Sequence, residues 1–544
     1  MSEWRKATGN ENFALFLIKY LKKIPIFILM KSIVVFFDEH SDFEEKKVFD
    51  GKNALELSKN WACALGFEYF YVNASTLADF LQQVNSIVSE NHADCVVFSY
   101  ADLPFLNVAL TEKLLKSHFE YKCEYSFADG FPYGFAPEII DAGTLKILYE
   151  MTQKTQIELG KNCFSRTAIF DLIKTDINAF EVNSVLSQTD WRLWRFAFHC
   201  GYKENFLQCK NLLSGALEKK ICVFDKDCDV EVLCKTACEN LSCLKTVPAF
   251  YDIQICDKEI VDCIYSPYFD EYSKKNNVSP DKSQNFMSFE LYSNLIDDIV
   301  RTSDSAVISL SDWGEPLCHP DFFKIIEKTL SYQGISVFLE TSCFNVDKEF
   351  CLNLKAIVEN ALVRKNDYDK IMICVKLDAF SEKMYKKIHP NVKDGDFERL
   401  VENVKMLCET LPGLVYPQFV RMNENEEELE SFFRFWNEKT NPSFGKLTVQ
   451  KYQSFCNLLP DRKPADLSPL ERNPCWHLRR DMTILSNGDV PMCKQCVFSN
   501  IVGNVFEQPI EEIWKKTDNI LLMHLSEKYP SFCEKCDEYY TYNF

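Results

Sequence analysis

The chain has 544 residues, which at about 150 residues per domain predicts three or four domains. Its 61 basic and 80 acidic residues leave a net charge of −19, whereas a nucleic-acid-binding protein usually carries a basic excess. Hydrophobic residues make up 47% of the chain, so large cores can form and disorder is excluded as the main state. Only 16 glycines are present, which argues against several glycine-rich phosphate loops.

Twenty-four cysteines are scattered through apolar segments, with a few close pairs near the C-terminal end. This density is far below that of a small disulfide scaffold, so we expect a cytoplasmic protein whose cysteines are mostly small buried hydrophobes. The N-terminal extension, 1–29, leads into the apolar run Ile24–Met30. Lysines bracket this run too tightly for a membrane span of about 20 residues. We therefore expect no membrane association.

Region 30–215 alternates short apolar runs with helical periods. Ser32–Phe37 and Cys95–Tyr100 have the composition of buried strands, and Ala54–Leu65 has that of a helix. Alternating strands and helices favour an α/β domain with a parallel sheet.

Residues 216–248 are helical in period and rich in charge, and we interpret them as a connecting segment. They contain five cysteines, between Cys222 and Cys243. These could bind a metal, but no close pair is matched by a second pair, so buried or bystander thiols are the favoured interpretation.

Region 249–455 repeats strand and helix. The expected strands are Tyr251–Ile255, Ala306–Leu310, Ile335–Glu340, Ile371–Leu377, Val415–Met422 and Lys446–Tyr452. The expected helices are Ser288–Arg301, Pro320–Tyr332, Phe397–Leu411 and Glu426–Trp436. Six such units predict a partial or full parallel barrel, with its chemistry at the carboxyl ends of the strands.

Proline and charge in 456–474 mark a linker, and the last region, 475–544, is too short for a large core. It carries Cys475, then Gly488 after twelve residues, then Cys493 after four more, and it closes with the pair Cys533 and Cys536. A small cytosolic domain of this kind is typically held together by a metal centre. Thiolates suit zinc or an iron–sulfur cluster, and the spacing does not separate the two.

The segment from Cys475 to Cys536 resembles the SPASM domain, the auxiliary-cluster domain of many radical S-adenosylmethionine enzymes. The matching features are the Cys-x12-Gly-x4-Cys spacing, the step Gly503-Asn504, the Ile513-Trp514 helix and the closing C-x2-C pair. The resemblance implies one 4Fe-4S cluster. The ligands it assigns are Cys475, Cys493, Cys533 and Cys536, with Cys496 as a spare or an alternative.

Region 249–455 resembles a radical S-adenosylmethionine barrel of the (β/α)6 type. Its segment Gly314-Glu315-Pro316 is similar to the glycine-glycine-glutamate-proline motif that receives the aminoacyl end of the cofactor. Glu340-Thr341 and Lys376 to Asp378 resemble other pocket positions more loosely.

The catalytic motif of that family, C-x3-C-x2-C after the first strand, is altered in this chain. Aligned on it, Glu259 takes the first ligand position, Cys263 the second and Ser266 the third, with Cys256 nearby. Oxygen ligands are hard and poorly suited to an iron–sulfur cluster. We therefore expect weak binding of S-adenosylmethionine, by Gly314 and Glu315, without reductive cleavage.

Asp102, after the strand Cys95–Tyr100, resembles the Mg²⁺-binding aspartate of cytidylyltransferase-like nucleotidyltransferases, which have the glycosyltransferase A-type fold. Asp129 is a candidate second carboxylate. The loop after Phe37 lacks the expected glycines and is acidic, which disfavours phosphate binding.

The order of a nucleotidyltransferase-like head, a radical-type barrel and a SPASM tail resembles the spirochaete spiro-SPASM proteins. Our leading hypothesis is a 4Fe-4S protein of radical-enzyme ancestry that serves electron transfer, binds a peptide or protein partner, or catalyses a modified reaction. The alternatives are a radical enzyme with non-standard cluster ligands, a nucleotidyl or nucleotide-sugar transferase, and a structural zinc protein.

Overall fold

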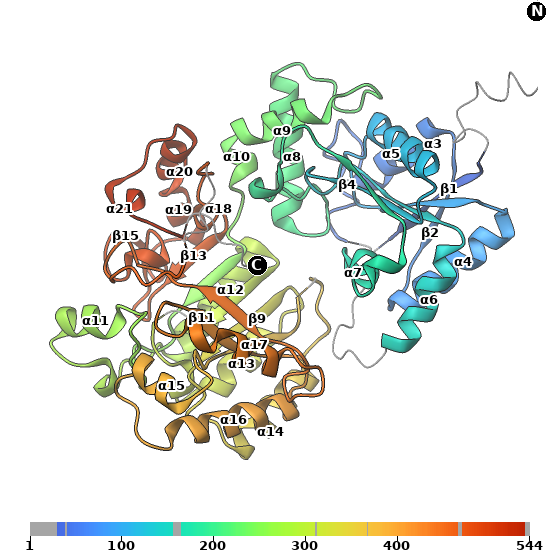
Figure 1. The fold of residues 1–544 in the computed structure, drawn as a ribbon. Coiled ribbons are helices and arrows are strands. Elements are labelled where there is room, and N and C mark those ends of the chain that lie inside the picture. The colour runs from blue at the N-terminus through green and yellow to red at the C-terminus, as the bar shows by residue number, and fades with distance from the viewer. Residues whose placement is uncertain are drawn as a thin grey trace, which may run out of the picture. The chain divides into compact units, whose positions relative to one another are not determined.

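A computed structural model describes residues 30–38, 41–155, 165–310, 313–366, 368–465 and 471–538. The predicted extension, 1–29, and the last residues of the tail, 539–544, lie outside the described residues. The chain divides into two compact units, of which the first holds most residues up to 243 and the second those from 244 onward. Figure 1 shows the first unit in blue to green and the second in green to red.

A six-stranded sheet forms the centre of the first unit, in the order β2-β1-β3-β5-β4-β6. Its strands are β1 (Ser32–Phe37), β2 (Glu68–Val72), β3 (Cys95–Tyr100), β4 (Tyr125–Asp129), β5 (Glu138–Asp141) and β6 (Val182–Leu186). Every residue of β1 and β3 is buried, as expected for central strands covered on both faces. The bounds of β1 and β3 agree with the prediction.

The first sheet is largely parallel, in line with the prediction, but it contains one antiparallel strand that was not predicted. Strand β5 runs antiparallel to both β3 and β4, while the other neighbours are parallel. Residues 130–137, between β4 and β5, are too few for a crossover connection, which takes about a dozen residues or more. The chain must therefore turn back beside β4.

Eight helices accompany this sheet. They are α3 (Ala54–Leu65), α4 (Leu77–Asn91), α5 (Val108–Tyr121), α6 (Thr144–Thr155), α7 (Ala168–Lys174), α8 (Lys203–Glu218), α9 (Val230–Glu239) and α10 (Leu241–Leu244). Helix α3 agrees with its predicted bounds because Asn53 and Glu56 form a capping box at its start and Gly66 ends it in the left-handed conformation.

The second unit is built on a seven-stranded parallel sheet in the order β12-β11-β10-β9-β8-β7-β13. Its strands are β7 (Phe250–Ile253), β8 (Ala306–Leu310), β9 (Ile335–Thr341), β10 (Ile371–Lys376), β11 (Val415–Arg421), β12 (Thr448–Lys451) and β13 (Asp481–Ile484). The first six correspond to the six predicted strands, and their ends differ by at most two residues.

Seven helices follow the strands of this sheet up to residue 436. They are α11 (Tyr268–Asn276), α12 (Phe289–Ser303), α13 (Phe322–Leu330), α14 (Lys348–Asn360), α15 (Glu382–Ile388), α16 (Asp396–Thr410) and α17 (Leu429–Trp436). The buried faces of α12 to α17 and most of the strands share one apolar core, which includes Ile308, Ile326 and Phe419, whereas α11 buries Tyr268 and Tyr272 in a second cluster. The predicted helix Glu426–Trp436 begins with a 3-10 turn before α17.

The C-terminal region contributes a strand to this sheet, which differs from the predicted six-stranded barrel followed by a separate small domain. Strand β13 pairs in parallel with β7 from Asp481 opposite Phe250. It covers the edge of β7, which would otherwise expose unpaired backbone groups. The rest of the tail is a hairpin of β14 (Asp489–Pro491) and β15 (Ile501–Asn504) with helices α18 (His477–Arg480), α19 (Ile510–Lys515), α20 (Asp518–Leu525) and α21 (Ser531–Glu534).

None of the helices in the described residues combines the length and the apolar composition that crossing a membrane requires.

Candidate functional site

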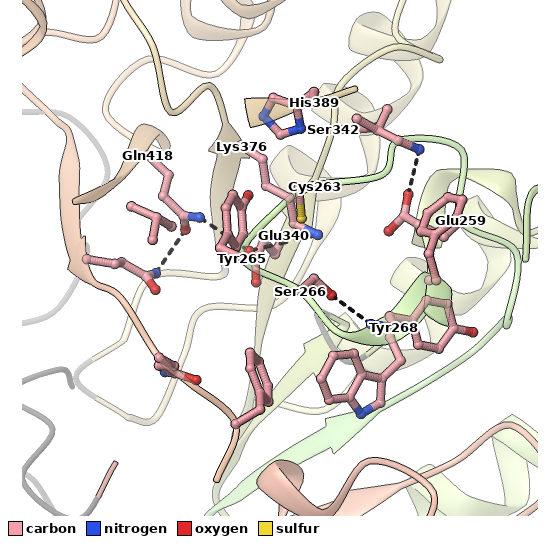
Figure 2. A pocket seen from close by; sticks show the side chains of 18 of the residues that line it. Glu259, Cys263, Tyr265, Ser266, Tyr268, Glu340, Ser342, Lys376, His389 and Gln418 are labelled. Carbon is pink, nitrogen blue, oxygen red and sulfur yellow. Dashed lines mark hydrogen bonds and ion pairs between the residues drawn. The ribbon is translucent and has the colours of Figure 1, made fainter. Parts of the chain in front are cut away.

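A pocket opens beside the loops that follow the carboxyl ends of β9 to β12, where a parallel barrel places its chemistry (Figure 2). Its volume is about 110 Å³. The loop after β7 supplies Glu259, Cys263 and Ser266 to its wall, and Lys494 of the tail also lines it. The pocket therefore includes a residue that lies between two tail cysteines, Cys493 and Cys496.

Polar side chains from four adjacent strands line the pocket in a row. Gln450 on β12 donates through Nε2 to Oε1 of Gln418 on β11, at 2.9 Å. Gln418 in turn donates to Oε1 of Glu340 on β9, at 3.4 Å, and Lys376 Nζ on β10 lies 3.9 Å from the same oxygen. Figure 2 shows Gln418, Glu340 and Lys376 close to one another in the pocket. The row presents amide, carboxylate and ammonium groups to a ligand.

The pocket holds opposite charges close together. Burial raises the pKa of Glu259 to about 7, and the positive charge of Lys376 partly offsets this rise. Burial alone would lower the pKa of Lys376, but the negative charges of Glu340 and Glu259 outweigh it and hold the pKa above its usual range. Lys376 is therefore charged at neutral pH and serves as the counter-charge of both carboxylates.

The three positions of the altered cysteine motif make separate contacts. Glu259 Oε1 accepts hydrogen bonds from the backbone N–H groups of the next two residues, at 2.8 and 3.2 Å. Ser266 Oγ accepts one from the N–H of Tyr268 at 3.3 Å. The Cys263 thiol lines the pocket, and burial raises its pKa above the usual range. Among these three positions only Cys263 offers a sulfur.

Gly314 lines the pocket as predicted, but Glu315 and Pro316 are not part of its wall. Glu315 is 1% exposed, and its carboxylate is surrounded by donors. Oε1 accepts from Thr341 Oγ1 at 2.7 Å, and Oε2 accepts from both the N–H and the hydroxyl of Ser342 at 2.7 Å. The carboxylate thus fastens the loop after β8 to the end of β9, and it does not face a ligand in the pocket.

A second polar group beside the pocket surrounds Asp378, a position that the family resemblance matched only loosely. Asp378, after β10, is fully buried and accepts a hydrogen bond from the Tyr265 hydroxyl at 2.7 Å and one from the N–H of Val420 at 2.7 Å. His389 Nε2 lies 3.6 Å from the same carboxylate. The left-handed backbone of Asp378, with φ of 57°, is a signal of local constraint that only coordinates reveal.

The structure brings the tail cysteines within electrostatic range of one another. Cys493 Sγ lies 3.7 Å from Cys496 Sγ, and this hydrogen bond lowers the pKa of Cys496 to about 7. Burial, with the negative charge of Cys536, raises the pKa of Cys475 to about 12, and burial with the charges of Cys475 and Cys536 raises that of Cys533 to about 12. We call these five sulfurs, which act on one another's pKa, the thiol cluster.

Cys456 is a sixth member of this thiol cluster and was not predicted. It lies in the loop after β12, close enough to Cys536 to lower the pKa of that thiol. Cys456 was overlooked because the segment 456–474 was predicted to be only a linker. Its position just past a strand's carboxyl end was the available signal.

The arrangement of these sulfurs can be compared with what a single ion and a larger cluster require. In a tetrahedral zinc site with bonds of about 2.3 Å, sulfurs lie about 3.8 Å apart, close to the Cys493–Cys496 distance of 3.7 Å. Across the part of the chain that the structure describes, however, no three Cys, His, Asp or Glu side chains surround one point closely enough for one ion. A cubane spreads its four thiolates over a larger volume than a single ion does, so it does not require three side chains around one point.

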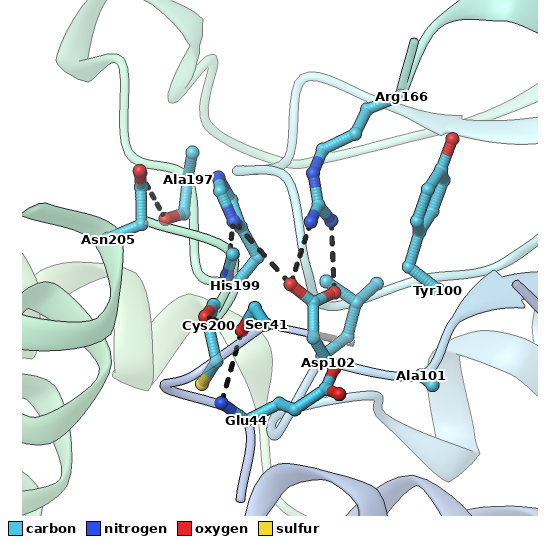
Figure 3. A network of polar contacts seen from close by, with 12 residues as sticks. Ser41, Glu44, Tyr100, Ala101, Asp102, Arg166, Ala197, His199, Cys200 and Asn205 are labelled. Carbon is cyan, nitrogen blue, oxygen red and sulfur yellow. Dashed lines mark hydrogen bonds and ion pairs between the residues drawn. The ribbon is translucent and has the colours of Figure 1, made fainter. Parts of the chain in front are cut away.

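Asp102, in the first unit, lies in a buried polar network (Figure 3). Its two carboxylate oxygens accept from Nη1 and Nη2 of Arg166 at 3.0 and 2.7 Å, and His199 Nδ1 lies 3.8 Å from Oδ2. A Mg²⁺ ion would have to displace the arginine from the same oxygens. Asp129, the candidate second carboxylate, pairs with Arg192 at 3.2 Å on a more exposed surface.

Comparison with known families and proteins identifies part of the chain. Residues 475–537 match SPASM, described as an iron–sulfur cluster-binding domain, and this confirms the resemblance found at 475–536. An uncharacterized protein of Treponema pallidum is 35% identical over 385 residues, which cover 70% of this chain and 100% of that protein.

Solved structures are similar to about half of the chain, at low sequence identity and low TM-score. BtrN in complex with AdoMet and 2-DOIA is 14% identical and covers 54% of this chain and 94% of its own, with a TM-score of 0.33. Streptococcus suis SuiB bound to S-adenosylmethionine is 13% identical and covers 63% and 92%, with a TM-score of 0.39. Likenesses this distant concern the fold alone. By its relationship to the Treponema pallidum protein, the chain belongs to that protein's family, and it ends in a SPASM iron–sulfur cluster-binding domain.

Proposed function

We propose that this chain is a 4Fe-4S protein of radical S-adenosylmethionine ancestry, similar to the spiro-SPASM proteins, that does not generate a radical. Cys475, Cys493, Cys533 and Cys536 would hold the cluster, which supplies one-electron chemistry when bound. The protein then serves electron transfer or the binding of a peptide or protein partner. Support for the cluster comes from the family match over 475–537 and from the convergence of the tail thiols.

The observation that carries the loss of radical chemistry is the state of the altered motif. Glu259 is 7% exposed and bonded to its own loop, and Ser266 accepts from the backbone of Tyr268. Neither side chain is a soft ligand, so Cys263 would be the single thiolate where three are needed. The side chains of Glu259 and the half-buried Lys376 line this part of the pocket, where a cluster would need thiolates.

The metal is tested by anaerobic purification followed by iron, sulfide and zinc analysis. We expect about four irons and four sulfides per chain with visible iron–sulfur absorption. Cys533→Ala should remove the absorption and loosen the tail, because metal binding and folding are coupled in small metal domains. Stoichiometric zinc without sulfide would contradict the proposal and favour a structural zinc protein.

The reaction is tested by reducing the reconstituted protein with dithionite in the presence of S-adenosylmethionine. We expect no 5′-deoxyadenosine above a chelator-treated control, although weak cofactor binding at Gly314 is compatible with the proposal. Turnover that disappears in Cys263→Ala would show that the altered motif still supports an active cluster, and it would establish the radical-enzyme alternative.

A further inference from the structure

The thiol cluster has an internal pattern: two pairs and two single cysteines. Cys493 and Cys496 are hydrogen-bonded at 3.7 Å. Cys456 lies near Cys536, and the two thiols shift each other's pKa. Cys475 and Cys533 influence their neighbours through charge, and each has no single thiol neighbour of this kind among the described residues.

Contacts between the loop that carries Cys456 and the residues after Cys536 hold these two segments together. Lys451, at the end of β12, forms an ion pair with Glu538 at 2.9 Å and donates to the carbonyl of Asp537 at 2.6 Å. The N–H of Ser454 donates to the Asp537 carboxylate at 3.1 Å. The loop that carries Cys456 is thus fastened to the residues directly after Cys536.

A further contact fastens the same loop to the other pair. Gln495, between Cys493 and Cys496, donates through Nε2 to Oε1 of Gln453 at 3.0 Å. The barrel loop 451–457 is therefore tied to both C-x2-C segments of the tail.

The backbone around Cys456 is held in an unusual conformation. Phe455, Cys456 and Asn457 have φ values of 50°, 57° and 67°, in the left-handed region that non-glycine residues rarely adopt. Such conformations are costly for non-glycine residues and persist where the surrounding contacts over-determine them. The loop conformation that directs Cys456 toward the tail therefore lowers the stability of the protein.

The chemistry of a cubane limits how such pairs can be used. Each iron binds one protein thiolate at its corner, and separate corners need separated sulfurs. Two neighbouring sulfurs therefore compete for one corner. Cys493 and Cys496 are such neighbours at 3.7 Å. The contacts of Lys451 and Ser454 with Asp537 and Glu538 bring the loop of Cys456 beside Cys536 in the same way.

We propose that Cys456, from the barrel loop, is an alternative ligand to Cys536 at one corner of the tail iron–sulfur cluster. This inference rests on the proposed function. A swap breaks the iron–sulfur bond to one cysteine and forms it to the other. The arriving thiol releases its proton, the departing thiolate takes one up, and no electron is transferred. The tail cluster would then have one ligand that belongs to the barrel.

The test measures iron and sulfide in four variants: Cys536→Ala, Cys456→Ala, the double variant of these two, and Cys533→Ala. Cys533 serves as the comparison because no second cysteine is proposed for its corner. We expect both single variants at the paired corner to retain most of the wild-type iron and sulfide. The double variant and Cys533→Ala should lose about tenfold, because no thiolate remains for one corner. The reduced cluster of Cys536→Ala should also show an altered electron paramagnetic resonance spectrum, since a different cysteine holds that iron.

Different results would contradict the proposed cluster and the proposed alternative ligand. Suppose that the wild type contains iron and sulfide, but Cys536→Ala loses as much of both as Cys533→Ala does. That result would overturn the alternative ligand and leave the cluster itself standing. Zinc without sulfide in the wild type would overturn the cluster itself and the inference with it. Circular dichroism of each variant identifies a loss caused by unfolding, and Cys536→Ser provides a smaller change at the same corner.

Discussion

Arg166 and Asp102 form a bidentate ion pair at the carboxyl-end side of β3, with both nitrogens of the guanidinium fork donating at 3.0 and 2.7 Å. Both side chains are less than a tenth exposed. The guanidinium also lies over the ring of Tyr100, 4.6 Å from its centroid. This arrangement is consistent with a structural role for Asp102. Both of its oxygens are bonded to Arg166, so neither is open to the Mg²⁺ ion that a nucleotidyltransferase would need there.

We predict that Asp102→Asn destabilises the first unit by about 3–5 kcal/mol, because it leaves the buried guanidinium without this counter-charge. Hydrogen exchange of peptides from β1 and β3 measures the local loss. Asp190→Asn is the matched control, since its ion pair with Arg192 is more than half exposed and should contribute less than about 1 kcal/mol.

The same variant also tests nucleotide binding. Titration of the wild type with nucleoside triphosphates or sugar nucleotides and Mg²⁺ should release little heat. Tight binding that Asp102→Asn abolishes, with only a small loss of stability, would instead support the transferase alternative.

Glu138 on β5 predicts a pH dependence of stability. Burial raises its pKa from 4.5 to about 7, with partial relief from a hydrogen bond with Tyr125. The unfolded chain therefore releases this proton first, and stability falls as pH rises from about 4.5 to about 7. Below this window the group is protonated in both states, and above it the full cost of the buried charge remains.

Glu138→Gln should remove that fall. Between pH 5 and pH 8 the free energy of unfolding of the wild type should fall, relative to that of Glu138→Gln, by on the order of 1–3 kcal/mol. Urea denaturation at the two pH values measures it. An unchanged difference would mean that the carboxylate is solvated in solution.

Much of the fold could be predicted because its strands carry their signal locally. The six-residue apolar run of β1 is typical of a strand buried on both faces, and β8 likewise agrees with its predicted bounds. The places of β5 and β13 could not be predicted from periodicity, since it does not specify a partner. The antiparallel turn before β5 depends on a short connection, and β13 pairs with β7 across more than 200 residues of chain.

The candidate site was predictable where residue type alone determines the chemistry. The tail cysteines and Gly314 belong to this class. The sequence could not reveal that Glu315 is satisfied by Thr341 and Ser342, because those donors come from the next strand. Cys456 was missed for a related reason: its function depends on a loop conformation with positive φ, and no local composition marks it.

Gly314 should tolerate no side chain. Its φ is +107°, and a Cβ would lie 2.4 Å from the carbonyl oxygen of Cys256. We expect Gly314→Ala to cost more than about 3 kcal/mol and to lower the thermal unfolding midpoint of the second unit, because backbone atoms must move. Gly395→Ala is the control: its φ is +81° but nothing lies within 4 Å, so it should cost about 1–2 kcal/mol. Equal losses would contradict the proposed close approach.

The last prediction restores the missing ligands. Glu259→Cys combined with Ser266→Cys recreates the C-x3-C-x2-C spacing with Cys263. Both positions line the same pocket as Cys263, and Lys376 lies close enough to balance the negative charge of new thiolates as it now balances Glu259. Since ligand identity and spacing dominate cluster capture, the double variant should bind a second cluster, with about four more irons per chain. Ser266→Cys alone supplies only two thiolates and should gain no cluster, and Cys263→Ala in the double variant should remove the gain. A double variant that stays folded and keeps its tail cluster but gains no iron would show that the barrel lost more than its ligands, because the pocket itself would then be too small for a cubane.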